Sequence, residues 1–98
     1  MFLGKVIGKV WATVKDPNFE GVHFKIVQPL DEELRPRGEP IVATDALGVG
    51  EGEIVMWEDG REAALALPGR FGPTEAAIVA KVDEVRVRGR VIKAYEGR

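Results

Sequence analysis

The chain has 98 residues and a formal net charge of −2 at pH 7, with 45% hydrophobic and 31% charged residues. This length predicts a single domain, residues 1–98, with one modest core. The weak negative charge gives no general attraction to nucleic acid or to an anionic membrane. The chain has no cysteine for a disulfide or a thiolate metal site. No apolar run approaches the roughly 20 residues of a membrane span, and no signal peptide is apparent, so we expect a cytoplasmic protein.

The first predicted element is a long strand over Phe2–Val14. Its even positions are apolar or glycine, whereas Lys5, Lys9 and Thr13 occupy odd positions. This alternation is typical of a strand with one buried face. The turn residues of Asp16-Pro17-Asn18 end it.

Three shorter strands follow. The second carries Val22, Phe24 and Ile26 on its predicted buried face and closes at Pro29. The third is Ile41–Asp45. A tight glycine loop, Gly48-Val49-Gly50-Glu51-Gly52, then leads into the fourth strand, Glu53–Trp57. Asp59 is predicted to start a short helix over Arg61–Leu67, in the pattern of a capping box.

The C-terminal part predicts a fifth strand, Ala76–Val87, and a hairpin. Apolar residues change parity after Asp83-Glu84, as a β-bulge would produce. Arg88-Gly89 has turn character and leads into Val91-Ile92. The chain is therefore predicted to be all-β with one short helix: a small five-stranded OB-like β-barrel plus a C-terminal hairpin.

Some apolar residues exceed what one small barrel needs. Leu3, Ile7 and Trp11 lie on the second face of the first strand, and Val55 and Trp57 are similarly surplus on the fourth. A bare apolar face indicates a packed partner. Scattered surface hydrophobic residues are the ordinary alternative.

Three stretches in order resemble the EutN/CcmL family, the vertex proteins of bacterial microcompartment shells. They are MFLGKVIGKVWATVKDPNFEGVHFKIVQPLD (1–31), VATDALGVGEGEIV (42–55) and AAIVAKVDEV (76–85). The resemblance implies an OB-like barrel and a homopentamer that caps the fivefold vertices of a shell. Its partners would be hexameric and trimeric shell proteins, and it would be a structural protein that needs no cofactor.

The same resemblance places the glycine loop near subunit contacts and the fivefold axis. Together with the surplus apolar face, it gives a predicted set of subunit-interface or axial-loop residues. The set is Leu3, Ile7, Trp11, Gly48, Gly50, Gly52 and Glu53.

The candidate chemical sites are weak. The glycine loop precedes a strand and not a helix, which disfavours a nucleotide site. His23 has no clustered second ligand, so no metal is expected. Asp45 and Asp83 could form an acid–base pair, but local hydrogen bonding or pairing between subunits is the favoured interpretation. No serine or cysteine is present as a nucleophile, so we expect no catalysis.

A basic stretch leaves three interpretations open. Its residues are Lys81, Arg86, Arg88, Arg90 and Lys93. It could be a solvated face, or it could pair with a neighbouring subunit through Glu51, Glu53, Glu58 or Asp59. It could also form the nucleic-acid groove of an OB barrel, but the dispersed aromatic residues argue against stacking platforms. An OB-type nucleic-acid-binding module is therefore the alternative function.

Overall fold

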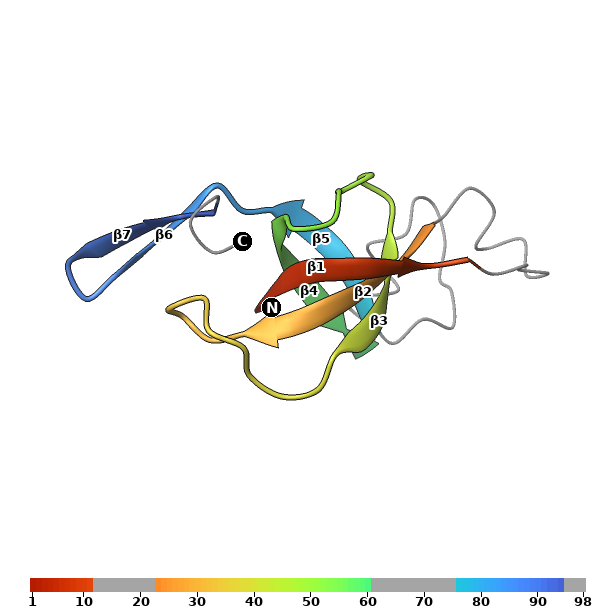
Figure 1. Ribbon diagram of the computed structural model, residues 1–98, viewed down its shortest axis with the longest axis horizontal. Helices are drawn as coiled ribbons and strands as arrows, with labels where there is room; N and C mark the ends of the chain where they lie inside the picture. The colour runs from red at the N-terminus through yellow and green to blue at the C-terminus, as the bar shows by residue number, and fades with distance from the viewer. Residues whose placement is uncertain (12–22, 61–75, 95–98) are drawn as a thin grey trace.

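The computed structural model describes residues 1–11, 23–60 and 76–94. Strands dominate these ranges (Figure 1). They are β1 (Phe2–Val10), β2 (His23–Leu30), β3 (Ile41–Asp45), β4 (Ile54–Asp59), β5 (Ala76–Lys81), β6 (Glu84–Val87) and β7 (Arg90–Lys93).

Five of the strands close into a barrel in the order β1-β2-β3-β5-β4, with β4 returning to β1. β3 and β5 run parallel, and the other neighbours are antiparallel. Across the parallel pair, the Thr44 hydroxyl donates to the carbonyl of Ala76 at 3.3 Å. The predicted all-β, five-stranded barrel with a C-terminal hairpin is confirmed. The predicted helix over Arg61–Leu67 lies outside the described residues, and Asp59, its predicted start, is the last residue of β4.

The barrel interior holds a compact apolar core. Its buried members are Val6, Val27, Ala43, Val49, Val55, Trp57, Ala76 and Ile78. The prediction that Val55 and Trp57 are surplus is therefore wrong. Val55 opposes Gly4 in the ladder, and opposed residues point to the same face, so both belong to the inner side. The Trp57 indole N–H donates to the Leu3 carbonyl at 3.2 Å, which gives the buried ring a polar partner.

A bulge in β1 changes which residues face the core. The β1–β2 register shifts between Val6 and Gly8, so Ile7 is the extra residue. Val6 opposes Val27 inside the barrel, whereas beyond the bulge Gly8 opposes Ile26. The prediction that Phe24 and Ile26 belong to the buried face is wrong, because both lie half-buried on the outer face.

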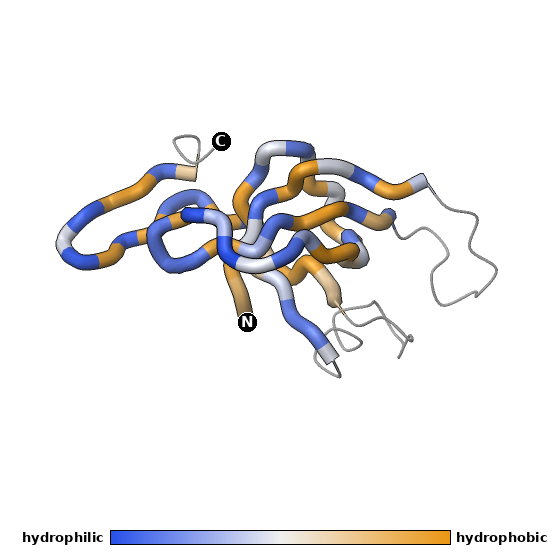
Figure 2. Tube along the Cα trace, turned by 60° about the horizontal axis from the view of Figure 1, so that its bottom comes forward, coloured by the Kyte–Doolittle hydropathy of each residue, from blue (hydrophilic) through white to orange (hydrophobic). Residues whose placement is uncertain are grey.

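A second apolar cluster covers part of the outer surface. Its buried residues are Leu30, Leu34, Ile54 and Ala94, and Leu3, Val82, Val85 and Ile92 pack against it. The hairpin of β6 and β7 therefore docks on the barrel at its base and projects beyond it (Figure 1). Hydrophobic and hydrophilic residues both occur along the hairpin (Figure 2). They alternate in β6 (EVRV), as expected when one face of a strand packs, whereas β7 (RVIK) has two adjacent apolar residues.

The predicted single strand over Ala76–Val87 is two strands. β5 ends at Lys81 in the barrel, and β6 begins at Glu84 in a separate two-stranded sheet. The change of parity therefore marks the exit of the chain from the barrel, because the residues of β6 pack against a different surface. The predicted turn is confirmed: Arg88 and Gly89 both have positive φ (47° and 74°), as a two-residue hairpin turn of the I′ kind requires.

Gly4 is a position where the barrel has no room for a side chain. A Cβ there would clash with Val27 Cγ1 and lie 3.1 Å from Trp57 Cδ1. We expect Gly4→Ala to reduce the free energy of unfolding by about 1–3 kcal/mol, the usual cost of overpacking a core. Urea denaturation at matched protein concentration measures this change.

Gly8→Ala is the matched control on the same strand. Its Cβ would meet Ile26 Cδ1 at an ordinary 3.5 Å, so this variant should unfold close to the wild type. Equal destabilisation by the two substitutions would contradict the packing argument.

Candidate functional site

The glycine loop after β3 is shaped by one carboxylate. Asp45 is 1% exposed. Its Oδ1 accepts hydrogen bonds from the backbone N–H groups of Leu47 and Gly48, and its Oδ2 accepts from Val49, all at 2.9 Å. The expectation of local hydrogen bonding for Asp45 is confirmed. Asp83 is exposed between β5 and β6, whereas Asp45 is buried.

Lys25 completes this arrangement from the neighbouring strand. Its Nζ lies 3.0 Å from Asp45 Oδ2 and donates to the Val49 carbonyl at 2.6 Å. The two side chains, here called the Lys25–Asp45 pair, are 13% and 0% exposed. Val49 itself is buried in the barrel core. The pair and the seated Val49 side chain therefore fix the loop to one end of the barrel.

The far side of the loop is tied to β1. Gly52 N–H donates to the Val6 carbonyl at 2.7 Å, and Val6 N–H donates to the Glu53 carbonyl at 2.9 Å. Gly48 and Gly52 have φ values of 79° and 91°, where glycine is favoured. Gly50 has no positive φ, and a Cβ there would meet only Glu53 Oε1 at an ordinary 3.6 Å. Its own chain therefore leaves room for a Cβ at Gly50.

The loop also presents an apolar residue that the sequence analysis missed. Leu47 is 55% exposed, although its backbone N–H is held by Asp45. The available signal was a leucine between the strand-ending aspartate and the first glycine. A leucine at this position is costly to expose unless something covers it.

The other predicted interface residues fall into different environments. Leu3 packs against the hairpin cluster of its own chain. Ile7 and Trp11 are 41% and 84% exposed, and Lys9 Nζ lies 4.4 Å from the centre of the Trp11 ring. The carboxylate of Glu53 lies 3.1 Å from Lys81 Nζ. The structure therefore brings the glycines and Glu53 together in one loop but does not join Leu3 to them.

A second apolar surface lies on the outer face of β1, β2 and β3. Val10 opposes Phe24, and Ile26 opposes Val42, so these four side chains share that face. Val42 is 55% exposed and the other three are partly buried. The bulge at Ile7 moves Val10 to this face, whereas Phe24, Ile26 and Val42 lie there through the alternation of their own strands. The sequence analysis therefore missed this outer stripe.

Comparisons with known proteins agree with this architecture. The family profile described as ethanolamine utilisation protein EutN/carboxysome matches residues 1–83. The chain belongs to the EutN/CcmL family.

The EutN/CcmL relatives match over almost the whole chain. The carboxysome shell vertex protein CcmL of Synechococcus elongatus is 37% identical over 92 residues, or 94% of this chain and 93% of the relative. The microcompartment shell vertex protein GrpN of Rhodospirillum rubrum is 39% identical over 85 residues, or 87% and 96%.

Solved structures of the family superpose closely. An ethanolamine utilization protein EutN gives a TM-score of 0.85 at 31% identity, over 93% of this chain and 95% of the other. The structure of GrpN from Rhodospirillum rubrum is described as a pentameric microcompartment shell protein. It gives a TM-score of 0.76 at 38% identity, over 89% of this chain and 98% of the GrpN chain.

The basic stretch of this EutN/CcmL chain pairs with acidic residues of the same chain. Arg88 reaches Glu32 and Glu33, each at 3.2 Å, and Arg90 reaches Glu33 at 3.4 Å. Arg86 and Lys93 both bind Glu84, at 2.6 and 2.8 Å. The pairs of Arg88 and Arg90 connect the hairpin to the 31–35 loop, and those of Glu84 lie within the hairpin. The stretch is therefore not an uncompensated basic groove.

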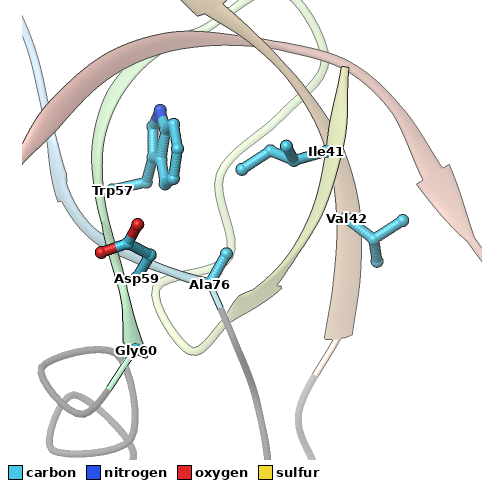
Figure 3. Close-up of a pocket in the computed structure, with 6 residues that line it drawn as sticks. All are labelled: Ile41, Val42, Trp57, Asp59, Gly60 and Ala76. Carbon is cyan, nitrogen blue, oxygen red and sulfur yellow. The ribbon is translucent and has the colours of Figure 1, made fainter. Parts of the chain in front are cut away.

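One large pocket lies at an end of the barrel. Its volume is about 690 Å³, and its lining is Ile41, Val42, Trp57, Asp59, Gly60 and Ala76 (Figure 3). Ile41 points toward Trp57, whereas Val42 points to the other side of β3. Among the described residues no group of three His, Cys, Asp or Glu side chains could hold a metal. In the same ranges, no helix is long and apolar enough to cross a membrane.

Glu84 makes the hairpin sensitive to acid. Hydrogen bonds from Lys93 and Arg86 lower the pKa of its carboxyl from 4.5 to about 2. Because the folded pKa is depressed, these bonds stabilise the hairpin fully above pH about 4.5 and lose that effect as pH falls toward 2. We expect a ¹³C NMR titration to give a Glu84 midpoint near 2.

Glu84→Gln is the matched control, because it removes the titrating group and keeps the shape. In this variant, amide exchange of the hairpin should not accelerate between pH 4.5 and 2 through loss of this carboxylate. A wild-type Glu84 midpoint near 4.5 would show that the two pairs do not persist in solution.

Proposed function

We propose that this chain is a structural shell protein that assembles into a homopentamer and caps the fivefold vertices of a bacterial microcompartment. The observation that carries this proposal is the match, over nearly the full length of both chains, to proteins described as shell vertex proteins. The GrpN structure, described as pentameric, supports the same assembly state for this chain.

The physical role follows from geometry. A flat layer of hexagonal units cannot close into a polyhedron, and fivefold units supply the curvature at its corners. A cyclic ring needs two different surfaces on each subunit, one for each neighbour. This chain offers two candidate surfaces, the loop with Leu47 and the outer stripe with Val42. Leu47 and Val42 are each 55% exposed.

The proposed partners are hexameric and trimeric shell proteins, and the proposed location is a shell inside the cell. The intramolecular pairing of Arg88 and Arg90 supports a role without nucleic acid, because few free cations remain along the hairpin to neutralise phosphates. The capping role of Asp45 supports a role without catalysis, because this carboxylate is already occupied by backbone N–H groups.

The first test is the assembly state of the purified protein. We expect size exclusion with light scattering to give about five times the 10.7 kDa mass of one chain, without any added ligand. A stable monomer across micromolar concentrations would overturn the proposal.

Shell closure can be tested at Gly50. A Cβ fits there and the residue is exposed, so Gly50→Leu should leave the barrel folded and obstruct a neighbouring copy. Co-expressed with a matching hexameric shell protein, the wild type should give closed polyhedra, and the variant should give open sheets or tubes. Electron microscopy distinguishes these products, and circular dichroism checks the fold.

Gly50→Ala is the small-side-chain control at the same position, because its Cβ fits beside Glu53 Oε1 at 3.6 Å. It should disturb closure less than the leucine variant. A Gly50→Leu protein that remains pentameric and caps shells normally would show that this loop is a passive surface turn.

A further inference from the structure

The Lys25–Asp45 pair does more than the barrel requires. We propose that it is a positioning device for assembly: it presets the 46–50 loop so that Leu47 docks against a second copy of this chain. This inference rests on the proposed homopentamer. It assigns two buried charged residues and one exposed leucine to the contact between subunits.

The hydrogen bonds of the pair are directed at backbone groups of the loop. Asp45 accepts from three consecutive N–H groups, those of Leu47, Gly48 and Val49. Lys25 holds the carbonyl of Val49 at 2.6 Å. The Val49 side chain, buried in the barrel core, also anchors the loop. The bonds of the pair add to this anchoring a single fixed path for the backbone that carries Leu47.

A fixed conformation of the 46–50 loop favours its docking against a second copy of the chain. Leu47 lies in the tethered segment, 55% exposed, next to Gly48 with its positive φ of 79°. Docking a loop that is already ordered avoids the loss of conformational entropy that a mobile loop would incur. An exposed leucine on such a loop has the character of an interface anchor, because its burial removes apolar surface from water at no ordering cost.

A second copy is the occupant that the remaining features favour. Gly50 lies at the other end of the loop and lacks a Cβ that its own chain would accommodate, which suits close approach of another backbone. The same chain also carries the apolar outer stripe of Val10, Phe24, Ile26 and Val42, of which Val42 is 55% exposed. A heterologous ring brings two different surfaces of neighbouring copies together, so a copy of this chain supplies an apolar counterpart for Leu47.

The test uses the full chain and compares ring dissociation with unfolding. Lys25→Met keeps the aliphatic stem and the three backbone N–H groups that bind Asp45, but it removes the bond to the Val49 carbonyl and the positive charge 3.0 Å from Asp45 Oδ2. Leu47→Ala removes the docking side chain. We expect each variant to raise the concentration at which rings dissociate by about tenfold or more, as sedimentation velocity over a dilution series measures. Far-ultraviolet circular dichroism should remain that of the folded barrel.

Two controls separate positioning from general stability. Val49→Ala weakens the core from the same loop and keeps the Lys25–Asp45 pair, so it should lower the urea midpoint more than it promotes ring dissociation. Val91→Ala removes a side chain of similar exposure, 49%, from the hairpin and should change neither quantity.

The outcomes distinguish this inference from the proposed function. The positioning role and the homopentamer are both supported if the wild type forms rings, the Lys25→Met and Leu47→Ala rings dissociate more readily, and the Val91→Ala ring is unchanged. A wild-type ring whose Lys25→Met and Leu47→Ala variants dissociate at the wild-type concentration overturns the positioning role and leaves the homopentamer standing. A monomeric wild type overturns both, because no second copy then contacts the loop.

Discussion

The buried ion pair between Lys25 and Asp45 is the interaction on which the functional end of this molecule depends. Two opposite charges, 3.0 Å apart and largely removed from water, are costly to bury unless their remaining hydrogen-bonding capacity is satisfied. Here three backbone N–H groups and one carbonyl satisfy it. The same bonds that compensate for burial also define the path of the loop, so the electrostatics and the shape of this surface have one origin.

The barrel and the hairpin solve separate packing problems. Inside, Trp57 and the aliphatic residues of the strands fill the core, and Gly4 provides the space that the indole and Val27 need. Outside, the hairpin covers Leu3 and Ile54, which a bare barrel would expose. The ion pairs of Arg88 and Arg90 lie at the surface, where each contributes little alone, so apolar burial supplies most of the docking energy and the charges orient the hairpin.

These features suit a building block. The described residues hold no metal-ligand cluster, and the one buried carboxylate is committed to backbone N–H groups. Apolar surface remains where a neighbour can cover it, on the loop at Leu47 and on the outer stripe at Val42. In our proposal a homopentamer buries these surfaces between its subunits. The polar and apolar side chains of the chain then serve the shape of the loop and the contact between subunits.

The sequence by itself determined the strand order in the chain, the terminal hairpin, the glycine loop and the family, because alternation, turn residues and motifs are local properties. Only the tertiary structure decided which side of each strand is inside. The bulge at Ile7 sends Val10 outward, and the pairing of Val55 with Gly4 sends Val55 inward. Likewise, Asp45, the partner of Lys25, lies 20 residues further along the chain, at the end of the next strand. Barrel closure brings together positions that no local sequence pattern connects. The buried side of each strand and the Lys25–Asp45 pair are therefore defined only once the strands are aligned.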